Sequence, residues 1–256
     1  MTETPGKPAG AGHVQSVERV FDLLELLADA GRAVTLSELS TSTDLPLPTV
    51  HRLLRTLVSL GYARQVADRR YTLGPRLVRL GDAASRQLGT LALPELRALV
   101  DELGETANMA VLDGDMVVYV AQAPSAHSMR MFTEVGRRAN LHNTGVGKAL
   151  MARFTDDAVR AVVARTGLQT PTPRSIGTIE ALLAELAAIR ERGYAIDDEE
   201  QEIGVRCYAM VVPGVPTPTA VSVSGPITRV DETFGARAVP LLRAAGAAIA
   251  ADLGLR

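Results

Sequence analysis

The sequence has a single cysteine, Cys207, no tryptophan, and few aromatic residues of any kind (4%). One cysteine excludes an internal disulfide bond and is typical of proteins that work in a reducing cytoplasm. The four histidines are scattered, and no set of residues has the spacing of a metal site, so we predict neither a metal nor a cofactor. No apolar run approaches the roughly 20 residues that cross a bilayer. We therefore predict a cytoplasmic protein that does not contact a membrane.

The length of 256 residues is enough for two domains, and a hydrophobic fraction of 46% is ample for packed cores. The N-terminus contains Pro, Gly and Ala but no apolar segment of the kind found in signal peptides. Further along, short helices and a hairpin give way to alternating helices and strands, which indicates an α+β protein. In the second half we predict strands over 106–112, 116–123, 205–212 and 220–224, and helices over about 94–103, 145–153, 156–166, 179–192 and 231–253. We predict a disordered tail (1–12), a helical domain with a hairpin (13–74), a linker helix (75–92) and a C-terminal α/β domain (93–256).

The N-terminal domain is predicted from periodicity and capping signals. Apolar residues recur with helical spacing over 14–30, and Thr35 and Glu38 form the T-x-x-E pattern of a capping box at the start of a second helix. Pro48 suits the first turn of a third helix that ends near Leu60. Two short stretches, 62–66 and 70–73, then predict a β-hairpin. In the linker, Leu77, Val78 and Leu80 belong to an apolar stripe suited to a dimer seam.

The third helix sorts its residues into two faces. Valine and leucine share one face, and hydroxyl, imidazole and guanidinium side chains share the other. Between Thr49 and Arg79 lie seven basic residues and one acidic residue, although the whole chain has a net charge of −2. Guanidinium groups bind guanine edges and phosphates, and the start of a helix favours a phosphate. The candidate DNA-binding residues are Thr35, Ser37, Thr49, His51, Arg52, Arg55, Arg69 and Arg70.

An amphipathic helix with a solvated face is the plain alternative, and for any single arginine it is as good an explanation as a DNA contact. The combination of a capped short helix, a polar-faced helix and a basic hairpin favours double-stranded DNA. A regulator that acts on a partner protein without DNA is disfavoured by the same features.

Three groups in the C-terminal half are candidates for binding a small molecule. Gly145, Val146 and Gly147 form a turn that opens a helix, where backbone N–H groups can bind a carboxylate. The turn lacks the residues of a phosphate-binding P-loop, which excludes ATP or GTP. Asp197 lies in an acidic run that is also typical of a solvated loop, and Cys207 also suits a small core residue. Ser222 and Ser224 share one face of a predicted strand, although paired serines are often only surface residues.

Several motifs, in order, resemble the IclR family of transcription regulators. They are VQSVERVFDLLELL, VTLSEL, LPLPTVHRLLRTLVSLGYARQ and RRYTLGPRLVRLG in the first half, and LHNTGVGKALMA, GYAIDDEEQEIGVRCYAMVVP and AVSVSGP in the second. The resemblance implies a winged helix-turn-helix followed by a profilin-like α/β effector domain, related to GAF and PAS sensors, that holds a small organic acid. The implied effector-binding residues are Gly145, Val146, Asp197, Cys207, Ser222 and Ser224.

In this interpretation the turn N–H groups and the serines bind the carboxylate, and Asp197 and Cys207 bind the other polar end. Val146 is larger than the small residue common in the family and narrows the pocket. Further apolar walls are predicted from strand position alone, and they are Met109, Val111, Met129, Met131 and Leu141.

The resemblance therefore predicts a homodimeric or tetrameric DNA-binding regulator: a repressor of a catabolic operon, released from its operator by a small keto or hydroxy acid. Other family effectors include ureide-related metabolites and aromatic acids, so the effector itself stays open.

The enzymatic alternative would use Cys207 as a nucleophile with His142 or His127 as base. No sequence pattern joins these residues. We predict no catalytic residues and no enzymatic activity.

Overall fold

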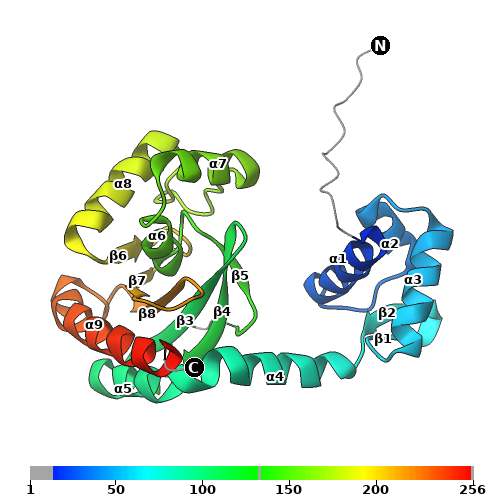
Figure 1. The fold of residues 1–256 in the computed structure, drawn as a ribbon, viewed down its shortest axis with the longest axis horizontal. Coiled ribbons are helices and arrows are strands. Elements are labelled where there is room, and N and C mark those ends of the chain that lie inside the picture. The colour runs from blue at the N-terminus through cyan, green and yellow to red at the C-terminus, as the bar shows by residue number, and fades with distance from the viewer. Residues whose placement is uncertain (1–13, 132–133, 255–256) are drawn as a thin grey trace, which may run out of the picture. The chain divides into compact units, whose positions relative to one another are not determined.

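The computed structural model describes residues 14–131 and 134–254, so the predicted tail over 1–12 lies outside the described residues. The chain divides into two compact units, Met1–Ala83 and Ala84–Arg256 (Figure 1). The division falls inside one helix, between the predicted domain boundaries at 74/75 and 92/93, which remain predictions. The α+β fold class, with a helix-turn-helix and a mixed α/β domain, is confirmed.

The first unit is a winged helix-turn-helix. Its elements are α1 (Gln15–Asp29), α2 (Leu36–Thr43), α3 (Leu47–Ser59), β1 (Ala63–Gln65), a 3₁₀ turn (Ala67–Arg69) and β2 (Tyr71–Leu73). Thr35 caps α2 as predicted, because its side chain accepts the Glu38 N–H and the Glu38 carboxylate accepts the Thr35 N–H. The three helices enclose a core of leucines and valines, which Tyr71 of the hairpin closes.

The hairpin forms the wing of this unit. β1 and β2 are antiparallel, and Val34 adds one bridge to Tyr71. At the tip, Asp68 and Arg69 both have left-handed backbone conformations, with φ of 57° and 55°. Such a turn matches the twist of a two-stranded ribbon, although side chains other than Gly and Asn adopt it at a cost. The turn places Arg69 and Arg70, both exposed, at the end of the wing.

The helix α4 (Arg76–Gly89) follows directly and corresponds to the predicted linker helix. In its first half, Val78 and Leu80 are 74% and 46% exposed. They belong to the apolar stripe that predicts a dimer seam.

The second unit is built on one antiparallel sheet with the strand order β5-β4-β3-β8-β7-β6. The strands are β3 (Thr106–Asp113), β4 (Met116–Ala123), β5 (Arg138–Asn140), β6 (Ala195–Asp198), β7 (Val205–Val212) and β8 (Thr219–Pro226). The helices are α5 (Leu93–Leu103), α6 (Gly145–Met151), α7 (Asp156–Thr166), α8 (Ile179–Arg192) and α9 (Glu232–Gly254), and a 3₁₀ turn (Thr90–Ala92) precedes α5.

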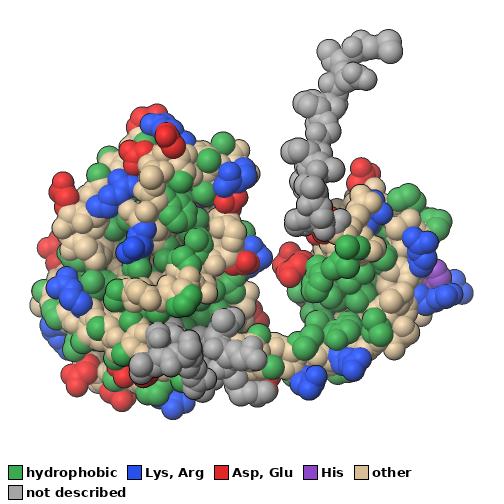
Figure 2. Space-filling model, in the orientation of Figure 1, with side chains coloured by type: hydrophobic (Ala, Val, Ile, Leu, Met, Phe, Trp, Pro, Cys, Tyr) green, Lys and Arg blue, Asp and Glu red, His purple; other side chains and the backbone are tan. Residues whose placement is uncertain are grey.

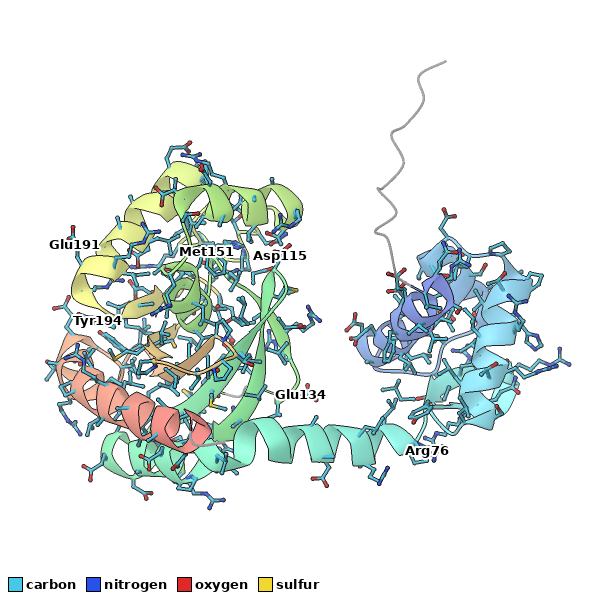
Figure 3. All side chains as sticks on the ribbon, in the orientation of Figure 1. Arg76, Asp115, Glu134, Met151, Glu191 and Tyr194 are labelled. Atoms are coloured by element: carbon cyan, nitrogen blue, oxygen red, sulfur yellow. The ribbon has the colours of Figure 1, made fainter. Side chains whose placement is uncertain are left out.

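The sheet separates two cores. α5 and α9 pack on one face, and α6, α7 and α8 cover the other (Figure 1). Side chains fill both layers, as the sticks in Figure 3 show; Met151 at the end of α6, labelled there, is buried in the second core. We call the side of the sheet toward α6 the α6 face.

By length and composition alone, α9 could cross a membrane. Phe234, Leu242 and Ile249 on this helix instead pack against the sheet.

A bulge in β4 changes which of its residues share a face. Met109 pairs with Ala121 but the next residue, Ala110, pairs with Tyr119, so Val120 is the extra residue. Beyond a bulge the alternation of side chains is shifted by one. Tyr119 and Gln122 therefore both lie on the α6 face, although strict alternation would separate them.

Several sequence-based expectations are wrong in this unit. The acidic run is not simply a solvated loop, because Asp197 and Asp198 end strand β6 and Asp197 is 4% exposed. β5, three residues long, is not among the predicted strands. Met109 and Val111 point to the core beneath α5 and α9, so they cannot line a pocket on the α6 face.

Candidate functional site

The surface of α3 carries the first candidate site. Val50, Leu53, Leu54 and Leu57 are buried against the rest of the unit. His51, Arg52 and Arg55 are exposed, and Thr49 is half-buried. Figure 2 shows basic side chains and a histidine together on the surface over this helix. The predicted division of α3 into an inner and an outer face is therefore present in the fold.

The arginines of this surface have few internal partners. Within residues 14–131 and 134–254, Arg52, Arg55 and Arg69 form no ion pair. Arg70 donates one long hydrogen bond, of 3.4 Å, to the carbonyl of Ala33. Guanidinium groups without internal partners keep their full capacity to bind phosphates or base edges.

The start of α2 is less open to a phosphate than the sequence predicts. The Thr35 hydroxyl and backbone N–H both donate to the Glu38 carboxylate, at 2.7 Å. These bonds, with an ion pair to Arg32, lower the pKa of Glu38 to about 2. Thr35 therefore serves as a helix cap, and a carboxylate already occupies this helix end. Ser37 is exposed beside it.

The second candidate site is a band of polar residues on the α6 face of the sheet. Strand pairing aligns Asp197, Cys207, Ser224 and Thr106 in one row across β6, β7, β8 and β3. The next row aligns Ala209, Ser222, Asn108 and Gln122. Four residues predicted from the sequence are thus side by side, and all four are buried: Asp197, Cys207, Ser222 and Ser224. The alternative that the two serines lie on the surface is wrong.

Gly145 brings the start of α6 directly onto this band. A Cβ atom at Gly145 would lie 2.8 Å from Cys207 Sγ and 3.2 Å from Ala209 Cβ, so only glycine permits the approach. Thr144 caps the helix by accepting the Gly147 N–H at 3.1 Å. Val146 is 1% exposed and shares a core with Cys207 and Leu141. The six predicted effector residues therefore form one cluster.

Met129 and Met131 do not join this cluster. Met129 is 72% exposed, and neither methionine belongs to the core that contains Cys207. Leu141 alone, of the five residues predicted as apolar walls, lies in that core.

Burial controls the ionisation of the cluster. It raises the pKa of Asp197 to about 7, and the nearby Glu200 carboxylate adds to the effect. It also raises the pKa of Cys207 to about 12, so the thiol is neutral at physiological pH. The hydroxyl and thiol groups of the cluster are therefore uncharged, and its carboxyl group is partly protonated near pH 7, so it repels an anionic ligand less than an ordinary aspartate would.

Two amides that the sequence did not single out complete the band. Gln122 Nε2 donates to Asn108 Oδ1 at 3.1 Å, and Asn108 Nδ2 donates to Ser224 Oγ at 3.2 Å. Because Ser224 Oγ accepts from Asn108, its own proton serves as a donor, and within the cluster both Ser222 and Ser224 hydrogen-bond Cys207. The only sequence signal for these amides is that each interrupts an apolar strand.

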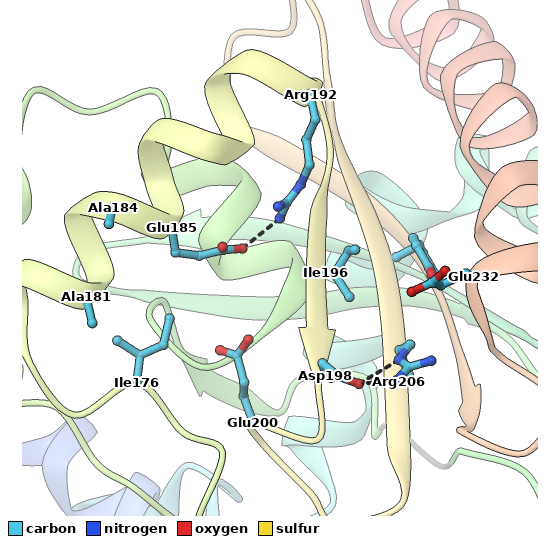
Figure 4. Close-up of a pocket in the computed structure, with 11 residues that line it drawn as sticks. Ile176, Ala181, Ala184, Glu185, Arg192, Ile196, Asp198, Glu200, Arg206 and Glu232 are labelled. Carbon is cyan, nitrogen blue, oxygen red and sulfur yellow. Dashed lines mark hydrogen bonds and ion pairs between the residues drawn. The ribbon is translucent and has the colours of Figure 1, made fainter.

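A charged groove lies outside this band, between α8 and the edge strand β6 (Figure 4). Its volume is about 680 Å³. The arginines that line it already have partners: Arg192 pairs with Glu185 at 2.6 Å, and Arg206 pairs with Asp198. None of the predicted effector residues lines the groove.

Comparisons with known proteins place the chain in a family. Residues 16–67 match the family model of the IclR helix-turn-helix domain, and residues 82–251 match that of the bacterial transcriptional regulator IclR C-terminal domain. The chain belongs to the IclR family of transcriptional regulators. It is 36% identical to the transcriptional repressor IclR of Escherichia coli over 249 residues, which cover 91% of each chain.

Solved structures of IclR regulators share the architecture. The regulator from Alicyclobacillus acidocaldarius matches with a TM-score of 0.83 and 29% identity, covering 94% of this chain and all of the other. An IclR homologue from Microbacterium hydrocarbonoxydans, complexed with 4-hydroxybenzoate, matches with a TM-score of 0.78 over 94% of this chain and all of the other. At 24% identity, this second likeness concerns the fold alone.

Membership of the IclR family confirms a transcription regulator rather than an enzyme. The chemistry of Cys207 agrees, because a buried thiol whose pKa is raised to about 12 is a poor nucleophile. His142 is also engaged, since its Nε2 lies 2.8 Å from the carbonyl oxygen of Gln169.

Proposed function

We propose that this IclR-family regulator is a cytoplasmic repressor of a catabolic operon, released from its operator by a small organic acid. The observation that carries the proposal is the buried polar cluster of Asp197, Cys207, Ser222 and Ser224 beneath Gly145. A buried group of uncharged hydroxyl and thiol groups, with a carboxyl group that is partly protonated near pH 7, matches a ligand that is small, polar and anionic.

In the DNA-binding unit, α3 enters the major groove, with Arg52 and Arg55 on base edges or phosphates. His51 and Thr49 lie beside them on the same helix. The hairpin tip, with Arg69 and Arg70, contacts the adjacent backbone or minor groove, and Ser37 contacts a phosphate. The absence of internal ion pairs at Arg52, Arg55 and Arg69 in the described part of the chain supports these roles. Thr35 contributes through the helix cap.

In the effector unit, Ser222 and Ser224 donate to the carboxylate of the acid, together with the backbone N–H groups of Gly145 and Val146. Cys207 and Asp197 contact its other polar end. The hydrogen bond from Asn108 supports this role, because it makes the Ser224 hydroxyl a donor, and a ligand carboxylate would take over the proton that Ser224 shares with Cys207.

The regulator acts as a homodimer or a pair of dimers, with paired α3 helices spaced to match an operator of two half-sites. The exposure of Val78 and Leu80 on α4 supports a seam along that helix. Ligand binding shifts the equilibrium only if the acid binds the DNA-competent and DNA-incompetent arrangements unequally.

The test uses the full-length protein and DNA from its own promoter region in fluorescence anisotropy. We expect binding that weakens steeply with salt, and release of the DNA by at least one acid among pyruvate, lactate, glyoxylate and 4-hydroxybenzoate. Replacing both Ser222 and Ser224 by Ala should preserve DNA binding and abolish the release. Promoter binding that none of the acids alters would refute the small-acid effector.

A further inference from the structure

Tyr119 of β4 lies on the α6 face although it was not among the predicted site residues. Its side chain is 7% exposed and shares a core with Cys207 and Val146. In its row across the sheet, the neighbours on β3 and β8 are Ala110 and Ala220. These small side chains leave room for the ring to extend over the sheet toward the polar band.

The Tyr119 hydroxyl forms no hydrogen bond with any residue in 14–131 or 134–254. The ring is buried, but the hydroxyl keeps some accessible surface, because Glu200 Oε2 is the only fully buried side-chain oxygen or nitrogen without a partner in the described residues. Burial raises the pKa of Tyr119, and negative charge on Cys207 or Asp197 would raise it further. The hydroxyl therefore lies within electrostatic range of two residues of the effector cluster.

Other polar groups of the same sheet have partners. Thr106 Oγ1 donates to the Met131 carbonyl at 3.1 Å, and Asn108 bonds to both Gln122 and Ser224. On the opposite face, the Tyr208 hydroxyl donates to the Asp231 carbonyl at 3.1 Å. Tyr119 differs from them because its hydroxyl has neither a protein acceptor nor a protein donor in the described residues and keeps some accessible surface beside the cluster.

We propose that Tyr119 contacts the effector and selects for it, by donating a hydrogen bond to an effector oxygen outside the carboxylate. This inference rests on the proposed small-acid effector and makes its chemistry more specific. The ligand is a short acid with a second oxygen, an oxo or hydroxyl group, on the carbon chain. An acid of equal length without that oxygen leaves the phenol unpaired and binds more weakly.

The test compares three acids of three carbons in isothermal titration calorimetry with the full-length protein. Pyruvate carries an oxo group, lactate a hydroxyl group and propionate neither. We expect the wild type to bind pyruvate or lactate about tenfold or more tightly than propionate. Tyr119→Phe should reduce this preference to about threefold or less, while its affinity for propionate changes less than twofold.

Tyr208→Phe is the matched control, because it removes a hydroxyl that has a protein partner on the other face. It should lower the melting temperature of the ligand-free protein and keep the wild-type preference for the second oxygen. Tyr119→Phe should leave the ligand-free melting temperature unchanged or raise it, since no protein hydrogen bond is lost. A fall equal to that of Tyr208→Phe would indicate a structural role and overturn the proposal.

The remaining outcomes separate the two proposals. In one outcome, Tyr119→Phe keeps the wild-type preference for a second oxygen while the Ser222→Ala, Ser224→Ala double variant loses acid binding. That result refutes the role of Tyr119 and supports the proposed effector site at the two serines. If the wild type binds none of the three acids and none of them releases DNA, both the short-acid effector and the role of Tyr119 are refuted.

Discussion

Lys148 Nζ lies 3.6 Å from a carboxylate oxygen of Glu185, although the lysine side chain is entirely shielded from solvent. The same ammonium group donates a hydrogen bond to Glu200, whose side chain is 9% exposed. Lys148 is on α6, three residues after Gly145, and Glu200 follows Asp197 by the same interval. A buried ion pair thus joins α6, which packs on the polar band, to the loop that follows β6.

Removing one partner of the Lys148–Glu200 ion pair should lower the unfolding free energy. Lys148→Met leaves Glu200 buried without its counter-charge, and such losses amount to about 3–5 kcal/mol of unfolding free energy. Urea denaturation at pH 7.5 measures the change. The double variant Lys148→Met, Glu200→Leu removes both charges and should recover most of the loss, because Glu185 keeps its ion pair with Arg192. Equal instability of the single and double variants would contradict this account.

The raised pKa of Asp197 predicts a pH-dependent stability. An aspartate with a pKa of about 7 in the folded protein, against its ordinary value of 3.8, takes up a proton on folding at any pH between these two values. Its contribution to stability is therefore fully present at low pH and is lost as the pH rises through 7. Between pH 5 and 8, the wild type should lose about 2–3 kcal/mol relative to Asp197→Asn.

Asp197→Asn suits this comparison because an amide oxygen can still accept the hydrogen bond that the Glu200 N–H donates to Asp197, at 2.8 Å. Unfolding free energies of both proteins, measured by urea denaturation at several pH values, give the difference directly. Parallel curves for wild type and variant would show that Asp197 is ionised throughout this range.

How well the sequence predicted each element followed from how local its signals are. The Thr35 and Glu38 capping box, and helices α7 and α8 with threonine caps and glycine ends, depend on residues within a few positions of one another, and all were predicted. β6 was not, because its strand character comes from pairing with β7, which buries Asp197 opposite Cys207. The acidic run contains no trace of that pairing.

The same reasoning explains the candidate site. Gly145, Asp197, Cys207 and the serines came from a resemblance between whole motifs, whereas Met109 and Val111 came from strand position alone and face the wrong core. Tyr119 and Gln122 share a face only because of the bulge at Val120. A bulge depends on register with a neighbouring strand, and a single sequence does not specify that register.

Arg52→Ala and Arg55→Ala should each weaken promoter binding about 5- to 150-fold, because a base-reading arginine contributes about 1–3 kcal/mol. Fluorescence anisotropy over a range of salt concentrations measures the effect, and loss of a phosphate contact would also reduce the salt slope by about one. Arg160→Ala, at an exposed position on α7, is the matched control and should bind DNA normally. Normal promoter binding by both the Arg52→Ala and Arg55→Ala variants would show that α3 does not contact the DNA through these arginines.

α6 can approach the sheet closely because Gly145 has a hydrogen atom where other residues have a Cβ. Gly145→Ala places a methyl group 2.8 Å from Cys207 Sγ, which is closer than two such atoms can be, so α6 must move away from the band. We expect a loss of about 1–3 kcal/mol in unfolding free energy, as for other overpacked cores, and loss of effector response with DNA binding retained.

Adding Cys207→Ala removes the sulfur and leaves the methyl group facing Ala209 Cβ at 3.2 Å, a contact that a small shift relieves. The double variant should therefore be more stable than Gly145→Ala alone, whereas Cys207→Ala in the wild-type background should be mildly destabilising because it leaves a small cavity. Additive losses in the three variants would mean that Gly145 and Cys207 do not meet, and would separate the glycine turn from the polar band.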